Sequence, residues 1–274
     1  MSLHSELLYN EKNDVDGSIA CWNIGMFGLN YPGQATDTQQ NWNNNKPVVP
    51  LRQSDDLTVD EWFAHGMKDY PPAPGNFMEL PSGGTFDGCD LACNRFYSRL
   101  RRPDVTVPQE EYACPDLAVL HVPRGAYFTP TPNSTWLGGS ALAISYTSDV
   151  DSLGPDNMTV ISVNATSPWW RLTTYEIPVL PPCPPGGCLC TWNWFHTNQD
   201  HEGYGAEMYN VLYRCNVTGN TDPTVVVHSG KVPTLCEDGP CVSGPKKPMV
   251  STLSYVITLE YTTNKISINF RRRE

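Results

Sequence analysis

Short runs in which apolar and polar side chains alternate recur along the chain. Clear examples are Ala141–Tyr146, Thr159–Val163 and Tyr255–Tyr261. Because successive side chains of a strand point to opposite faces of a sheet, this alternation predicts strands. The 25 prolines and 21 glycines interrupt the chain too often for long helices. The pattern predicts an all-β fold, an immunoglobulin-like β-sandwich with long loops and one or two short helices.

The best helical pattern runs from Thr58 to Lys68. Thr58 can cap the helix, and Glu61 at the third helical position completes a capping box. Pro71 and Pro72 then stop the helix. We expect one short helix, set in a loop between strands.

Two segments, Asn30–Asn45 and Gly83–Pro108, hold few hydrophobic residues, and we expect both to be long surface loops held by cysteines. The proline-rich segment Pro181–Cys188 is expected to connect two strands. No internal repeat and no change in composition marks a second domain. We therefore expect a single domain over residues 18–274, with the polar residues 1–17 outside it as a disordered or non-native arm.

Ten cysteines and four glycosylation sequons point to an oxidising compartment. Cys89 and Cys93 have the spacing of half a zinc site, but no second half with histidines is present in the sequence, so disulfides are expected. We therefore expect a secreted glycoprotein, although no signal peptide precedes the fold in this chain. The sequons begin at Asn133, Asn157, Asn164 and Asn216.

The charge balance limits the partners. Twenty-nine acidic and 18 basic residues give a net charge of -11, which repels phosphate backbones and anionic lipids. No run of eighteen apolar residues is present that could cross a bilayer. The basic cluster Arg271–Arg273 is expected to be a solvated tail. We expect a monomer that binds neither nucleic acid nor membrane.

The most informative stretch is Cys190–His196, followed by a polar loop and Glu207–Cys215. Under a period of two, His196 shares a face with two tryptophans of its own segment, while Glu207 and Tyr209 share a face of the next segment. An antiparallel hairpin would bring His196, Glu207 and Tyr209 together. The alternative is a purely structural role, in which His196 is a core histidine and Glu207 and Tyr209 support the hairpin.

Other chemistry-bearing groups have plain structural explanations. Trp169 and Trp170 are expected in the core rather than on a sugar-stacking edge. The cluster Asp200–Glu202 is expected to be a solvated turn rather than a metal site. No nucleophile elbow, phosphate-binding loop or His-Glu-x-x-His motif is present in the sequence.

Several blocks in order resemble the fungal lytic polysaccharide monooxygenases of auxiliary activity family fourteen. The resemblance implies a secreted copper enzyme that oxidises xylan on cellulose. It runs from about residue 18 to 218 and is weak over the last fifty residues. The matching blocks are Ala20–Trp22, Gly25–Gly28, Lys46–Leu51, Asp69–Pro72, Phe77–Pro81, Ala143–Asp151 and Cys183–Cys215.

The resemblance also implies a copper site, and here the sequence departs from the family. The family holds copper with a histidine brace: the amine and ring of an N-terminal histidine, a second histidine and an axial tyrosine. Tyr209 stands at the axial position, Glu207 at the outer Gln or Glu, and His196 at the outer-sphere histidine. Ser18 and Phe128, however, stand at the two brace histidines.

We therefore expect a protein whose copper brace is lost and which binds cell-wall polysaccharide, xylan or cellulose, without cleaving it. An active copper-dependent monooxygenase is the alternative. A gapped alignment would then supply His121 as the second ligand, or cleavage after Leu3 would supply His4 as the first. A third hypothesis is copper sequestration through His196 and the loop histidines.

Overall fold

The computed structural model describes residues 19–32, 48, 50–52, 55, 57–92, 104, 106, 111–113, 137, 139–197, 204–232, 242–248, 255–262 and 265–272. For residues 52, 195–197, 204–207, 255–262 and 265–272 it describes the backbone alone. Within the described residues, no helix is long and apolar enough to cross a membrane.

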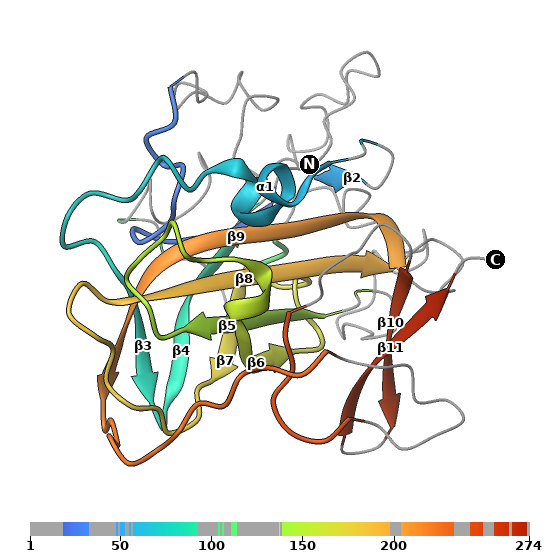
Figure 1. Ribbon diagram of the computed structural model, residues 1–274. Coiled ribbons are helices and arrows are strands. Elements are labelled where there is room, and N and C mark those ends of the chain that lie inside the picture. Colours follow the sequence, from blue (N-terminus) through green and yellow to red (C-terminus); the bar gives the residue numbers. More distant parts are fainter. Residues whose placement is uncertain are drawn as a thin grey trace, which may run out of the picture.

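The larger sheet has the strand order β2-β9-β8-β5-β6, and β3 also pairs with β9 (Figure 1). β9 is long enough to pair with β2 near its start and with β3 near its end. Its strands are β2 (Leu51–Arg52), β3 (Met78–Ser82), β5 (Ser140–Ser145), β6 (Thr159–Asn164), β8 (Cys188–Thr197) and β9 (Tyr204–Gly219).

The smaller sheet has the order β1-β4-β7, formed by β1 (Ala20–Trp22), β4 (Thr85–Ala92) and β7 (Leu172–Glu176). Buried residues of both sheets form one hydrophobic cluster. Trp192 of the larger sheet donates a hydrogen bond to the Tyr175 hydroxyl of the smaller one at 2.9 Å. The two sheets therefore enclose a common core, which confirms the predicted all-β, sandwich-like fold. β10 (Tyr255–Thr262) and β11 (Lys265–Arg272) form a separate antiparallel pair.

The alternation of apolar and polar residues predicted several strands correctly. The predicted runs at 141–146, 159–163 and 255–261 correspond to β5, β6 and β10. The proline-rich segment Pro181–Cys188 connects β7 to β8, as predicted, and the disulfide Cys183–Cys188 closes it.

The prediction of a surface loop over Gly83–Pro108 was wrong for its first part. Thr85–Ala92 is β4, the central strand of the smaller sheet, and it buries Phe86, Cys89 and Leu91. Its register shifts between Phe86 and Cys89, so the inward positions do not keep a period of two. The Phe86 ring lies over Gly88, where a side chain would collide with it. The bulge hid this strand from sequence analysis. Most of Asn30–Asn45 lies outside the described residues.

The predicted helix begins where expected and ends early. α1 covers Val59–Trp62 and continues as the 3-10 turn η3 (Phe63–Gly66), while a second turn, η7, covers Pro155–Asn157. Ala64 and His65 have φ of 56° and 52°, in the left-handed region, so the helix cannot continue to Lys68.

The N-terminal capping box of α1 is present. The Glu61 carboxylate accepts hydrogen bonds from the Thr58 hydroxyl at 2.7 Å and from the Thr58 backbone N–H at 2.8 Å. These bonds stabilise the ionised form and lower the pKa of Glu61.

Among the described residues, three disulfides confirm that cysteines staple the fold. Cys21–Cys89 joins β1 to β4, and Cys190–Cys215 joins β8 to β9. Cys89 is therefore bonded to Cys21 and is not part of a zinc pair with Cys93. No described cysteine is free.

Candidate functional site

The centre of the candidate site is the antiparallel hairpin β8–β9, which confirms the predicted pairing of these segments. Trp192 is opposite Val211, and Trp194 is opposite Tyr209. All four side chains are buried. The alternation predicted for this hairpin therefore holds, and these residues share the face that packs into the sandwich core.

Tyr209, which sequence analysis placed at the axial position of a copper site, is 2% exposed. Its ring stacks on Trp194, with centroids 5.0 Å apart and an interplanar angle of 21°. Trp194 is held in turn, because its indole N–H donates to the carbonyl of Leu137 at 2.9 Å. The described surroundings thus fix the Tyr209 ring on an aromatic platform.

Two asparagines occupy the opposite face of the same hairpin. Asn210 donates from Nδ2 to Asn193 Oδ1 at 2.6 Å, directly across the strand pair. The Asn210 Oδ1 atom accepts the backbone N–H of Ala64 at 2.6 Å. The Asn210 side chain therefore holds the segment after α1 against β9.

His65 is a buried residue of this region that sequence analysis missed. Its Nδ1 lies 2.8 Å from the carbonyl oxygen of Asn210. A carbonyl only accepts, so Nδ1 carries the hydrogen and donates it. The ring centroid is 6.4 Å from that of Tyr209. A lone histidine inside a run with helical spacing gave no sequence signal for this position.

The other predicted site residues are placed only in part. The backbone of His196 lies in β8 and that of Glu207 in β9, where Glu207 pairs with Arg52 of β2. The register shifts between Phe195 and Thr197, close to His196. The convergence of His196, Glu207 and Tyr209 therefore stays a prediction.

Several predicted positions lie outside the described residues, so the structure does not test them. They are Ser18, His121, Phe128, Asn133 and the turn Asp200–Glu202. Within the residues that are described, no three His, Cys, Asp or Glu side chains lie close enough to hold a metal ion.

The tryptophan pair is mainly structural. Trp169 is fully buried, which confirms its assignment to the core. Trp170 is half-buried and stacks on Tyr112, with centroids 5.0 Å apart. Next to it, Arg171 donates to Asp90 and to Glu111, each at 2.8 Å. This ion cluster, in which Arg171 and Asp90 are buried, ties β4 to the segment around residue 112.

Three of the four sequon asparagines are described. Asn157 is exposed, and Asn164 and Asn216 are half-buried at strand positions. The Asn216 amide Nδ2 lies 3.4 Å from the Glu79 carboxylate of β3.

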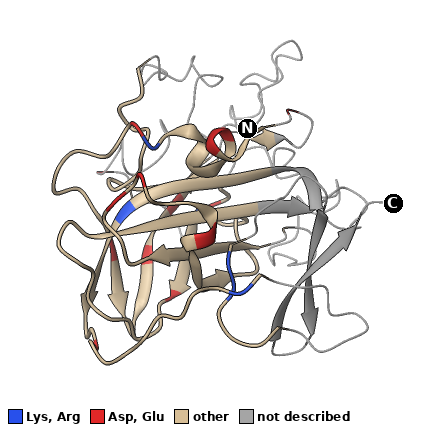
Figure 2. Ribbon diagram, in the orientation of Figure 1, with Lys and Arg blue, Asp and Glu red and all other residues tan. Residues whose placement is uncertain are grey.

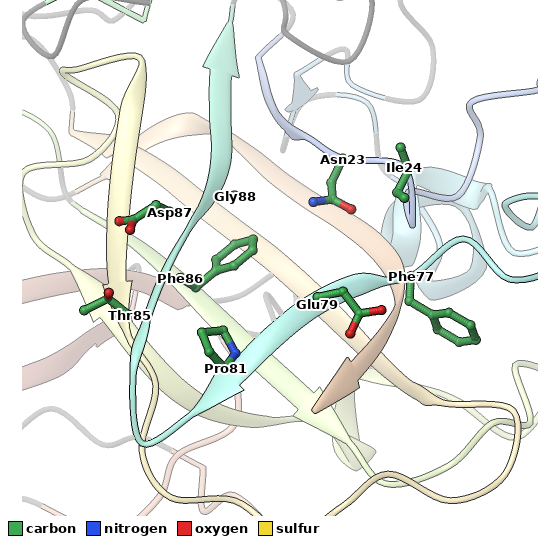
Figure 3. Close-up of a pocket in the computed structure, with 9 residues that line it drawn as sticks. All are labelled: Asn23, Ile24, Phe77, Glu79, Pro81, Thr85, Phe86, Asp87 and Gly88. Atoms are coloured by element: carbon green, nitrogen blue, oxygen red, sulfur yellow. The ribbon is translucent and has the colours of Figure 1, made fainter. Parts of the chain in front are cut away.

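A shallow groove of about 390 Å³ opens beside that carboxylate (Figure 3). β3 contributes Glu79 and Pro81 to its lining, and β4 contributes several more residues. Acidic positions are spread over the described strands (Figure 2). The full lining is Asn23, Ile24, Phe77, Glu79, Pro81, Thr85, Phe86, Asp87 and Gly88.

The fold and the hairpin define a disulfide-stapled β-sandwich with a buried tyrosine on an aromatic platform. The profile of the family described as lytic polysaccharide monooxygenase AA14 matches residues 5–251. This chain belongs to that family.

The relatives that resemble this chain are named as members of the same family. The chain is 34% identical to an AA14 family lytic polysaccharide monooxygenase B of Trametes coccinea, over 86% of this chain and 55% of the relative. It is also 34% identical to monooxygenase B of Pycnoporus cinnabarinus, over 86% of this chain and 61% of the relative. Monooxygenase A of Trametes coccinea is 33% identical, over 84% and 52% respectively. The chain thus spans between half and two thirds of the length of these relatives.

Proposed function

We propose that this chain is a secreted, glycosylated member of the AA14 family that binds cell-wall polysaccharide without the family's copper chemistry. The observation that carries the proposal is the donor set. Where the resemblance expects the two brace histidines, the chain has Ser18 and Phe128. A hydroxyl and a phenyl ring do not replace two imidazoles, which are the ligands that Cu(II) prefers in a tetragonal plane.

The described neighbours of Tyr209 give its ring a packing role. Its ring is enclosed by Trp194 and Trp192, and the histidine next to it, His65, is bound through Nδ1 to a backbone carbonyl. In this proposal the Tyr209 platform is retained because it packs the hairpin, and the scaffold keeps its shape for binding.

Polysaccharide binding follows from the names of the relatives and from the charge of the chain. A family named for acting on polysaccharide supplies the substrate class. The net charge of -11 disfavours anionic polymers and leaves neutral glycans, such as xylan and cellulose, as the suitable partners.

The test of the copper part is a Cu(II) titration with electron paramagnetic resonance on protein secreted by a fungal host. Natural processing of the N-terminus makes the result independent of where the mature chain begins. We expect weak binding and no tetragonal nitrogen signal. A tight one-to-one nitrogen site would contradict the proposal.

The test of the binding part is depletion of the same protein from solution by xylan-coated cellulose. We expect retention on the solid, with no oxidised oligosaccharides released when copper and a reductant are added. A protein that stays in solution with every polysaccharide would show that the binding function is wrong.

An active copper-dependent monooxygenase is the second candidate. Tyr209 is kept on its platform, and His196 and Glu207 lie in the paired strands β8 and β9. The missing ligands would then be His121 or a histidine exposed by processing, such as His4. Copper-dependent release of oxidised oligosaccharides that is lost in His121→Ala would support this candidate.

A further inference from the structure

The groove between β3 and β4 lies directly beside a glycosylation sequon. Asn216 is paired with Glu79 in the parallel β3–β9 ladder. Asn216 Nδ2, the atom that a glycan would be attached to, lies 3.4 Å from Glu79 Oε2, and Glu79 lines the groove. The attachment atom therefore lies against the wall of the groove, about 23 Å along β9 from Tyr209.

The surface around this atom is apolar as well as acidic. Leu80 is buried, whereas Glu79 and Pro81 lie on the outer side of β3. Phe77 is half-exposed just before β3, and the Ile24 side chain is 47% exposed at the same groove (Figure 3). Apolar patches beside polar groups suit a sugar ring, which has a C–H face and a rim of hydroxyls.

We propose that the groove binds the chain's own N-linked glycan, which is attached at Asn216. The first N-acetylglucosamine lies beside Phe77, and its hydroxyls donate to the Glu79 carboxylate. The sugars that follow extend along the groove past Pro81 to Asp87. A neutral sugar is the fitting occupant, because two carboxylates repel an anionic one. The inference rests on the part of the proposed function that takes the chain through a glycosylating compartment, and on neither copper nor polysaccharide.

The glycosylation reaction needs one co-substrate, an oligosaccharide linked to a lipid pyrophosphate. Asn216 Nδ2 forms a bond to C1 of the first N-acetylglucosamine, and the C1–O bond to the pyrophosphate breaks. The lipid pyrophosphate leaves with the electron pair, and Nδ2 gives up one proton. The remaining N–H can still donate to Glu79.

The two other described sequon asparagines have different surroundings. Asn164 donates from Nδ2 to the Thr174 carbonyl at 3.0 Å and accepts from Thr166. The Oδ1 atom of Asn157 accepts the Gly154 N–H at 3.0 Å. The hydrogen bonds described for these two asparagines go to residues that do not line the groove. Among the described sequons, the groove therefore belongs to Asn216.

The experiment uses full-length protein secreted by a fungal host. Peptide mass spectrometry is expected to find a glycan on Asn216. Thr218→Val then removes the sequon while keeping the shape of the side chain, and Thr218→Ser keeps the sequon. Phe77→Ala is made in all three backgrounds, with Phe77→Leu as the milder substitute if alanine prevents folding.

We expect Phe77→Ala to lower the melting temperature by about 2–4 °C more in wild type and Thr218→Ser than in Thr218→Val, because the sugar contact exists only with the glycan. Val226→Ala, at a side chain that is 68% exposed, is the matched control and should cost the same in every background. An unmodified Asn216, or an equal cost of Phe77→Ala with and without the sequon, would overturn the inference. Copper titration and polysaccharide depletion are separate measurements, so a failure here is distinguishable from a failure of the proposed function.

Discussion

The two faces of the β8–β9 hairpin hold the same strands in different ways. On the inner face, Trp194 and Tyr209 stack in the core, fully removed from water. On the outer face, Asn193 and Asn210 form a hydrogen bond, and Asn210 also holds the backbone of Ala64. The inner face gains its stability from buried area, the outer face from matched polar groups.

The two faces should respond differently to substitution. An aromatic core residue leaves a cavity when it is removed, whereas a buried amide leaves unpaired partners. Packing against Trp194 is sufficient to account for the buried position of the Tyr209 ring. The four variants that follow separate the two faces, beginning with the largest expected effect.

Trp194→Ala removes the platform of the inner face. Because the indole is fully buried and stacked on Tyr209, we expect a loss of about 3–5 kcal/mol in the free energy of unfolding, measured by urea denaturation. Trp170→Ala, at a half-buried ring, is the control and should cost less. Equal costs would mean that the inner face is not the main source of stability.

Asn210→Ala breaks the outer face. It removes the partner of the Ala64 N–H and the donor to Asn193 Oδ1, and we expect a loss of about 1–3 kcal/mol, again by urea denaturation. Asn193→Ala combined with Asn210→Ala should cost less than the sum of the two single changes, because they share one hydrogen bond. Strict additivity would contradict the described contact.

Tyr209→Phe keeps the ring on Trp194 and removes the hydroxyl. If Tyr209 serves packing, we expect a change of about 1 kcal/mol or less in the free energy of unfolding, with Cu(II) affinity unaltered. Tyr209→Leu, which loses the stacked ring, should cost more. A large fall in copper affinity for Tyr209→Phe would instead favour the active-enzyme candidate.

Glu61→Gln gives the smallest expected effect and tests the segment that the outer face holds. The folded pKa of Glu61 lies below 4.5, so its stabilising contribution is present above that pH and is lost as the pH falls below it. The variant should therefore show a weaker fall in stability between neutral and acidic pH than wild type, measured by urea midpoints. An unchanged pH dependence would show that the capping box contributes little.

Sequence alternation predicted the hairpin and several other strands because their inward residues keep a period of two. It missed β4, where the shift between Phe86 and Cys89 breaks that period. The helix ended early because Ala64 and His65 adopt left-handed backbone, which tertiary contacts to Asn210 impose and local sequence does not encode.

The candidate site was predictable only in the parts that lie on regular strands. The hairpin that carries Tyr209 was predicted, because strand alternation fixes which residues share a face. His65 was not found, since its approach to Tyr209 depends on a turn of long-range origin. Ser18, His121 and Phe128 remain predictions from the resemblance.

The long strand β9 also governs the order in which this chain can fold. β3 pairs with β9 in parallel. Glu79 of β3 can pair with Asn216 of β9 only after Asn216 has been synthesised, which happens much later. Among the described strands of the larger sheet, β2 and β3 pair only with β9, so both lack that partner until β9 has been synthesised. Pairings so distant in sequence form slowly and leave strand edges open to aggregation during synthesis. A sugar added to β9 early would make this late-arriving strand more soluble during that interval.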